Sequence, residues 1–306
     1  MKRRGFIARF SELFFTGLTA GAAALIVLSI LVFLVVIVRN GVDSLTWEYL
    51  STSPRGGIAG EGGIFPAIFG TIVLVFLMTI AVMPLGVLTA VYLHEYAPKN
   101  SRLVGAVRLA VQNLAGVPSI VFGLFGLGFF VQYVGGGIDE LFYGGRAIYG
   151  QPAIVWAALT YALLTLPTVI VATEESLRAV PDGYREVAYG LGASRWQVTT
   201  RVVLPNSMSG ILTGGILAIS RATGEVAPII FTGVAFSLPY LPTRLNHQFT
   251  QLGYHIYILA TQSPDIEKSR PLLFSAVLVL VVITFALVFF AIILRSRIRR
   301  KLRAGY

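Results

Sequence analysis

Two opposite charges in an otherwise uncharged stretch are the residues of this sequence best suited to bind an anion. Arg221 and Glu225 lie in a hydrophobic pattern that runs from 202 to about 234. An arginine at the centre of an isolated membrane helix costs roughly 2.5 to 3.5 kcal/mol, so it should face a protein interior. Spacing of four residues puts both side chains on one helical face, where they can pair. We predict that they line a substrate pathway, with Ser220 and Thr223 as neutral hydrogen-bonding groups.

The chemistry of this pair favours a protonated tetrahedral oxyanion. A guanidinium presents a planar fork of donors, which suits phosphate. The Glu225 carboxylate can accept a hydrogen bond from phosphate that keeps a proton, whereas sulfate has no such proton. We hypothesise that the pair disfavours fully deprotonated oxyanions. A packing salt bridge is the alternative, although arginine before glutamate is the poorer order for such a pair and for the helix dipole.

Other reactive residues are scarce. The chain has no cysteine, which excludes disulfides, thiolate nucleophiles and cysteine-based metal sites. Its three histidines are scattered along the chain, so we predict no metal site. No lysine follows a glycine, so the end of a P-loop is missing, and we see no nucleophile–base pair for a membrane enzyme. We therefore expect no catalytic residue, no bound cofactor and no ATPase activity in this chain.

Composition shows which elements must position the charged pair. Of 306 residues, 56% are hydrophobic and only 12% are charged, about half the charged fraction of a soluble domain. A helix needs about 20 residues to cross the hydrocarbon core. We predict an all-α integral membrane protein with six spans, a β-barrel being excluded by the continuous apolar runs. The predicted spans are 13–38, 62–93, 109–138, 147–173, 202–234 and 271–294.

The basic residues indicate how the spans are oriented. If both termini are cytoplasmic, 17 lysines and arginines lie in inside segments and six in outside segments, which fits the positive-inside rule. This bias explains the net charge of +10 through anionic lipid, without nucleic acid. The apolar stretch behind the basic amino end is too long for a signal peptide, so we predict an uncleaved anchor in the bacterial inner membrane.

The inside segment from Glu174 to Pro205 is patterned like a folded loop. The run Pro181-Asp182-Gly183 predicts the start of a short helix through Tyr184 to Tyr189. Ser194, with Gln197 three residues later, predicts a capping box that opens a second helix, which we expect to end at Pro205. From the pattern alone, a docking knob and an amphipathic interfacial helix fit equally well.

This loop carries a resemblance to a known family. Its elements Glu186-Val187-Ala188, Gly192 and Val202-Val203-Leu204-Pro205 resemble, with the same spacing, the EAA loop of bacterial ABC importer permeases, and Val187 and Val202 replace an alanine and an isoleucine of that pattern. In that family, the loop forms coupling helices that insert into a cleft of a cytoplasmic ATPase. The resemblance implies ATPase coupling through five positions, which are Glu186, Ala188, Gly192, Leu204 and Pro205.

Three further segments narrow the resemblance. Residues Tyr92–Ala97, Asn113–Gly123 and Ser220–Glu225 resemble the PstA-type permeases of phosphate-specific importers. The resemblance implies a type I ABC importer permease fold with cytoplasmic coupling helices. It further implies that the substrate is phosphate and that the chain lies in the lipid bilayer with three protein partners. These partners are a PstC-type permease, a PstB-type ATPase dimer that holds ATP and Mg, and a PstS-type phosphate-binding protein.

The expected organisation has three parts. An N-terminal segment, 1–60, holds the first span and an external loop; 61–295 forms the permease core with the EAA loop at 182–205; 296–306 is a basic tail. Two alternatives remain open for the function. One is an ABC permease for another oxyanion, sulfate or molybdate, and the other is an anion transporter or channel that works alone.

Overall fold

The computed structural model describes residues 2–55, 62–98 and 100–304, with side chains for 11–55, 62–98 and 100–300. The expected domain boundary between 60 and 61, Lys99 and the last two residues of the expected tail lie outside these ranges. Regular structure in the described chain is helical. The α-helices are α1 (Lys2–Gly41), α2 (Trp47–Ser51), α3 (Phe65–Val91), α4 (Arg102–Leu114), α5 (Ser119–Phe125), α6 (Gly136–Tyr143), α7 (Ile154–Arg178), α8 (Asp182–Gly190), α9 (Arg195–Val198), α10 (Leu204–Gly224), α11 (Leu252–Thr261) and α12 (Ile266–Ala304).

Short π and 3-10 turns join several of these helices into longer runs. The π turns are η1 (Tyr92–Tyr96), η2 (Gly126–Gly135) and η3 (Thr199–Val203), and the 3-10 turn is η4 (Ala227–Ile229). In the described residues, six helical runs are long and apolar enough to cross a membrane, which confirms a multi-pass all-α membrane protein. These runs are 11–41, 65–96, 119–143, 154–178, 195–224 and 266–300.

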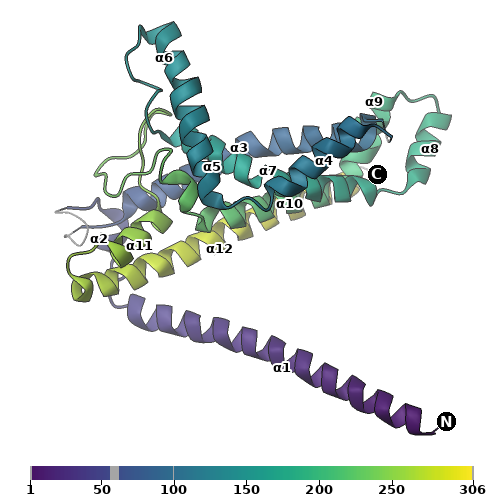
Figure 1. The fold of residues 1–306 in the computed structure, drawn as a ribbon, viewed down its shortest axis with the longest axis horizontal. Helices are drawn as coiled ribbons and strands as arrows, with labels where there is room; N and C mark the ends of the chain where they lie inside the picture. The colour runs from purple at the N-terminus through teal and green to yellow at the C-terminus, as the bar shows by residue number, and fades with distance from the viewer. Residues whose placement is uncertain (1, 56–61, 99, 305–306) are drawn as a thin grey trace.

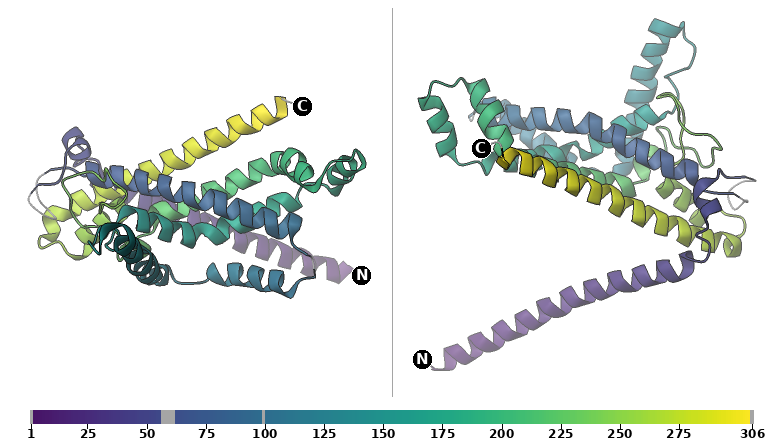
Figure 2. Two further views of the ribbon diagram at one scale, coloured as in Figure 1. Left: turned by 90° about the horizontal axis from the view of Figure 1, so that it is seen from above. Right: turned by 180° about the vertical axis from the view of Figure 1, so that it is seen from behind.

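The centre of the bundle is formed by α3, α7 and α10, with α12 along one side (Figures 1 and 2). Their shared core includes Leu74, Met78, Tyr161 and Ala222, all almost fully buried. Small residues permit the close approach of these helices. A Cβ atom on Gly86 of α3 would lie only 2.6 Å from a methyl carbon of Val169 in α7. Such close packing is typical of membrane helices, where van der Waals contact drives association.

Helix α1 lies apart from this bundle (Figure 1). It meets α12 near its carboxyl end, where the Ser275 hydroxyl donates to the Gly41 carbonyl oxygen over 2.6 Å. A side chain at Gly41 would collide with the α12 backbone, because its Cβ atom would lie 2.8 Å from the Phe274 oxygen. Most of the described side chains of α1 are exposed in this chain, as expected for an apolar helix whose neighbours are lipids or other chains.

The third predicted span is wrong as a single helix over 109–138. The chain divides there into α4 and a run from α5 to α6, with a turn at 115–118 between them. Pro118 lacks a backbone N–H and disfavours the helical conformation of Val117, so the helix stops. The run from α5 to α6 then turns away from the bundle (Figure 1).

The predicted span over 202–234 is also displaced. The helical run begins earlier, at Arg195, and ends at Gly224, where Glu225 adopts an extended backbone with φ −82° and ψ 141°. Pro205 does not end a helix, as we expected, but lies in the first turn of α10 after the π turn η3. Proline is tolerated in a first turn because its nitrogen needs no hydrogen bond there.

The ends of the chain and the folded loop share one end of the molecule. The amino end of α1, the pair α8 and α9, and the carboxyl end of α12 all lie towards the right of Figure 1. Helices α2 and α11 lie at the opposite end. The amino end of α1, the carboxyl end of α12 and the α8–α9 loop therefore lie at one end of the molecule.

Candidate functional site

Arg221 and Glu225 come together at the carboxyl end of α10. Arg221 Nε lies 3.8 Å from Glu225 Oε1, and their side chains are 37% and 29% exposed in the isolated chain. At this separation the contact is an ion pair without a hydrogen bond. Because α10 ends at Gly224, Arg221 occupies its last turn, where the helix dipole favours a cation. The order of charges that is unfavourable within a helix is thus avoided, since Glu225 lies beyond the helix.

The other two predicted pathway residues face different ways. Ser220 is exposed on the same side of α10 as Arg221, together with Leu217 and Gly224. Thr223 is fully buried instead, and its hydroxyl donates to the Ile219 carbonyl oxygen over 2.7 Å. The structure therefore brings Ser220 and Arg221 to one open face of the helix and turns Thr223 into the bundle.

Two distant side chains hold the end of α10 in place. The hydroxyl of the buried Tyr161 in α7 donates to the Glu225 carbonyl oxygen. The Gln251 side chain donates to the Thr223 carbonyl oxygen over 3.4 Å, and its amide oxygen caps α11 through the Tyr254 N–H. A helix end leaves carbonyl groups without intrahelical partners, and burying them unpaired is costly. Tyr161 and Gln251 therefore allow the helix to stop inside the bundle beside the charged pair.

The folded loop forms the two short helices predicted from its punctuation. Ser194 accepts from the Gln197 N–H, and the Gln197 side chain accepts in return from the Ser194 N–H, so the capping box is present. Gly192, between the helices, has φ +82°, a left-handed conformation that favours glycine. Gly192 therefore makes the turn that separates α8 from α9.

The outer surface of this loop is unusually apolar for an exposed segment. Leu191 is 85% exposed, and several large neighbours are also exposed. Glu186 lies exposed among them. We call this surface the coupling surface; its apolar members are Tyr184, Val187, Tyr189, Leu191 and Trp196. Exposed apolar patches of this kind mark interaction sites.

The remaining loop residues named from the sequence face inwards. Ala188 and Leu204 pack against a buried cluster formed by Val91, Leu177, Val180, Val198 and Val203. Pro205 is half-buried at the start of α10. These residues therefore join the loop to the ends of three membrane helices, whereas Glu186 and Gly192 remain on its outer side.

Glu95, within the segment Tyr92–Ala97, is an important residue for which the sequence predicted no role. It lies in the π turn after α3, and its carboxylate accepts from Arg185 Nη2 of α8 over 2.8 Å. Arg195 of α9 donates to the Glu95 carbonyl oxygen and lies over the Tyr96 ring, 5.1 Å from its centroid. These residues line a cleft of about 830 Å³ at the α8–α9 end of the molecule. An acidic residue two positions after a long apolar run was the signal available in the sequence.

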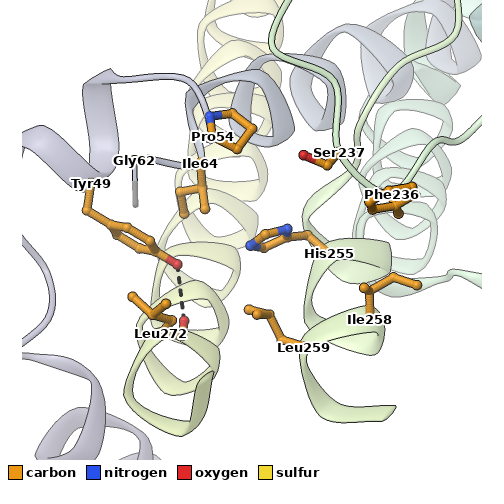
Figure 3. A pocket seen from close by; sticks show the side chains of 11 residues that line it. Tyr49, Pro54, Gly62, Ile64, Phe236, Ser237, His255, Ile258, Leu259 and Leu272 are labelled. Atoms are coloured by element: carbon orange, nitrogen blue, oxygen red, sulfur yellow. Dashed lines mark hydrogen bonds between the residues drawn. The ribbon is translucent and has the colours of Figure 1, made fainter. Parts of the chain in front are cut away.

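A second cavity lies at the opposite end, between α2, α11, α12 and the loop at Phe236 (Figure 3). Tyr49 donates to the Leu272 carbonyl oxygen over 3.1 Å at its edge. Burial lowers the pKa of His255 to about 4, and burial raises the pKa of Tyr49, so both side chains are neutral at physiological pH. The cavity measures about 20 Å³, which is room for about one water molecule. It is therefore too small for a substrate anion.

Comparisons with known proteins agree with this arrangement. Residues 82–304 match the family described as "Binding-protein-dependent transport system inner membrane component". The chain is 33% identical to the probable ABC transporter permease protein YqgI of Bacillus subtilis, over 87% of this chain and 90% of that protein. It is 36% identical to the phosphate transport system permease protein PstA of Yersinia pestis, over 75% and 72% of the two chains.

A solved structure shows the same fold. A chain of a bacterial alginate ABC transporter, crystallised with its alginate-bound periplasmic protein, superposes with a TM-score of 0.57 at 20% sequence identity. The superposition covers 76% of this chain and 78% of that one. At this identity, the likeness establishes the arrangement of helices.

Proposed function

Since the chain belongs to the family of binding-protein-dependent transport system inner membrane components, we propose that it is the permease subunit of an ATP-driven importer that moves inorganic phosphate into the cell. The observation that carries the choice of substrate is its 36% identity to a phosphate transport system permease over three quarters of its length. The open guanidinium of Arg221 supports it. Among the described contacts, Arg221 makes one ion pair, to Glu225, and no hydrogen bond, so its donors are free for an anion.

The translocation step uses the open face of α10. Arg221 binds the phosphate oxygens through its planar fork, and Ser220 on the same face supplies a neutral hydroxyl. Glu225 accepts a hydrogen bond from the protonated oxygen of the substrate. Thr223 contributes to the position of α10 and not to the pathway surface, because it is buried against the bundle. We keep 61–295 as the permease core, with α1 as a separate span.

The coupling step uses the opposite end of the molecule. The coupling surface docks into a cleft of a PstB-type ATPase dimer, which binds the ATP and Mg that this chain does not hold. The exposed apolar side chains of α8 and α9 and the exposed Glu186 support this role. A single loop engages one ATPase subunit, so a second permease, of the PstC type, is needed for the other. A PstS-type protein delivers phosphate from outside.

The orientation follows from charge and topology together. The bias of basic residues supports cytoplasmic termini, and the ends of α1 and α12 lie at the same end as the coupling surface (Figure 1). The first predicted span is then an anchor in the bacterial inner membrane. This arrangement leaves the coupling surface in the compartment that supplies ATP.

The proposal is tested by initial rates of labelled phosphate uptake at low phosphate. Cells deleted for this gene are complemented with the wild-type chain or with Arg221→Gln, at matched membrane levels. We expect the wild type to restore uptake and Arg221→Gln to lower the rate by at least about tenfold, because a charged hydrogen bond worth roughly 1.5 to 3 kcal/mol is lost. Arg221→Lys, which keeps the charge but loses the fork, should fall between them.

Three other results would redirect the assignment. If the wild type restores uptake of sulfate or molybdate and not of phosphate, the substrate is another oxyanion. Uptake that persists without a functional ATPase would indicate a transporter or channel that works alone. Equal uptake by wild type and Arg221→Gln would leave the importer intact and return Arg221 to a packing salt bridge.

A further inference from the structure

Both short helices of the folded loop are attached to one residue at the end of α3. Glu95 accepts from Arg185 of α8 through its side chain and from Arg195 of α9 through its backbone carbonyl. Arg195 also covers the Tyr96 ring next to it. The attachment therefore includes a charge pair, a backbone hydrogen bond and a cation–π contact at two consecutive residues.

The charge pair is shielded from water. The Glu95 side chain is 8% exposed and the Arg185 side chain 12%. Arg185 is held from behind as well, because it donates to the carbonyl oxygens of Val180 and Leu177 over 2.8 and 2.9 Å. Arg185 also pairs with the exposed Asp182 over 3.0 Å, so neutralising Glu95 would leave it only this solvent-exposed acidic partner. Glu95 and Arg185 therefore keep one fixed geometry rather than a surface contact that exchanges with water.

Chain connectivity does not provide this link. Helix α8 follows α7 after a short turn, and α9 continues into α10, so motion of the loop reaches α7 and α10 through the backbone. Glu95 lies 90 residues before Arg185 in sequence. Helix α3 thus depends on side-chain contacts to follow the loop, and the polar ones at its end centre on Glu95.

Helix α3 leads from this attachment towards the charged pair of α10. It packs along α7 through the bundle, and near its other end the Thr71 hydroxyl accepts from the Leu252 N–H over 2.9 Å. Leu252 follows Gln251, which holds the Thr223 carbonyl oxygen at the end of α10. One continuous helix therefore joins the coupling end of the molecule to the elements that fix Arg221 and Glu225.

We propose that Glu95 is a positioning residue for energy coupling, which transmits movement of α8 and α9 to α3. This inference rests on the proposed function. Glu95 touches neither phosphate nor ATP; it determines whether α3 moves with the coupling helices. Loss of the attachment should uncouple the two activities of the transporter, so that ATP is hydrolysed while little phosphate moves.

The test uses the complete transporter in proteoliposomes, with phosphate uptake and ATP hydrolysis measured on the same preparation. Glu95→Gln keeps the size of the side chain and removes its charge. We expect hydrolysis to be largely retained and phosphate moved per ATP to fall by about tenfold. Glu95→Asp, which keeps the charge on a shorter arm, should recover part of the ratio. The matched control is Glu174→Gln, which breaks a neighbouring pair of 3.2 Å with Arg108, outside the coupling helices.

A second measurement does not depend on the substrate. The chain has no cysteine, so a nitroxide can be placed at Gly183→Cys in the first turn of α8, an exposed site outside the coupling surface, without removing native thiols from this chain. In the complete transporter, Glu95→Gln should increase the mobility of this label, and Glu174→Gln should not.

The outcomes separate the two ideas. If the wild-type transporter moves no phosphate, the proposed function fails, and label mobility alone decides the role of Glu95. An unchanged ratio of phosphate to ATP in Glu95→Gln, or an unchanged label, would overturn the inference. A proportional loss of hydrolysis and uptake would also overturn it, because it would show a defect of assembly instead of coupling.

Discussion

The hydroxyl of Tyr161, in the first half of α7, donates a hydrogen bond to the backbone carbonyl of Glu225, beyond the end of α10. The acidic member of the charged pair is thus held by a residue 64 positions away in sequence. Tyr161 is fully buried, so no water replaces it when its hydroxyl is removed. The position of the Glu225 backbone therefore depends on the packing of two helices.

Tyr161→Phe should disturb this end of α10 without creating a cavity. The substitution leaves a buried carbonyl unpaired, which costs about 1 to 3 kcal/mol. We expect a lower thermal midpoint of the purified transporter and slower phosphate uptake. Differential scanning fluorimetry and the uptake assay measure the two effects. Tyr133→Phe, at a site that is 74% exposed, is the control, and equal behaviour of both variants would contradict the prediction.

Glu225→Gln should change selectivity more than rate. The neutral amide still accepts a hydrogen bond but no longer repels a fully deprotonated oxyanion. We expect sulfate uptake to rise relative to phosphate uptake in competition experiments with both labelled anions. The effect should be small where the external binding protein selects the substrate, so the assay needs a high sulfate concentration. An unchanged ratio of the two anions would show that Glu225 has no part in discrimination.

Gly192→Ala should weaken coupling through the backbone alone. The φ of +82° places Gly192 in the left-handed region, and a Cβ atom there would meet nothing within 4 Å. The cost is therefore conformational, about 1 to 2 kcal/mol. We expect less ATPase to be retained when the purified permease is captured. Gly105→Ala in α4, where there is equally open space, should retain the wild-type amount.

The small cavity beside His255, near α2 and α11, predicts that the stability of the protein falls in acid. His255 has a folded pKa of about 4, below its ordinary value near 6.5, so the native state requires the neutral ring. Its contribution to stability is complete above about pH 6.5 and is lost as the pH falls towards 4. We expect the thermal midpoint to fall over this range, and to fall less in His255→Gln. Identical pH profiles for the two proteins would refute the prediction.

Local patterns predicted the helical elements well. Length and hydropathy identified six spans, since a helix must satisfy its own backbone in lipid. The capping box at Ser194 and Gln197 was also predictable, because its two hydrogen bonds join residues three apart. Spacing of four likewise predicted the contact between Arg221 and Glu225.

Helix ends inside the bundle were less predictable. The apolar pattern runs to about 234, yet α10 stops at Gly224. It can stop there because the side chains of Tyr161 and Gln251 donate hydrogen bonds to carbonyl groups at its end. Neither residue carries a local signal for that role. The division of the third span at Pro118 had a signal, but the strength of a single proline depends on what packs around it.

The sequence by itself determined the class of this protein, because hydropathy, charge bias and capping act over one helix or less. It also determined the family, through the loop that holds Glu186 and Gly192. Only the tertiary structure decided that Arg185 and Arg195 of that loop contact the end of α3. The contact between Glu95 and Arg185 joins residues 90 positions apart, and such a pair forms only after the bundle has brought its helix ends together and excluded water from between them.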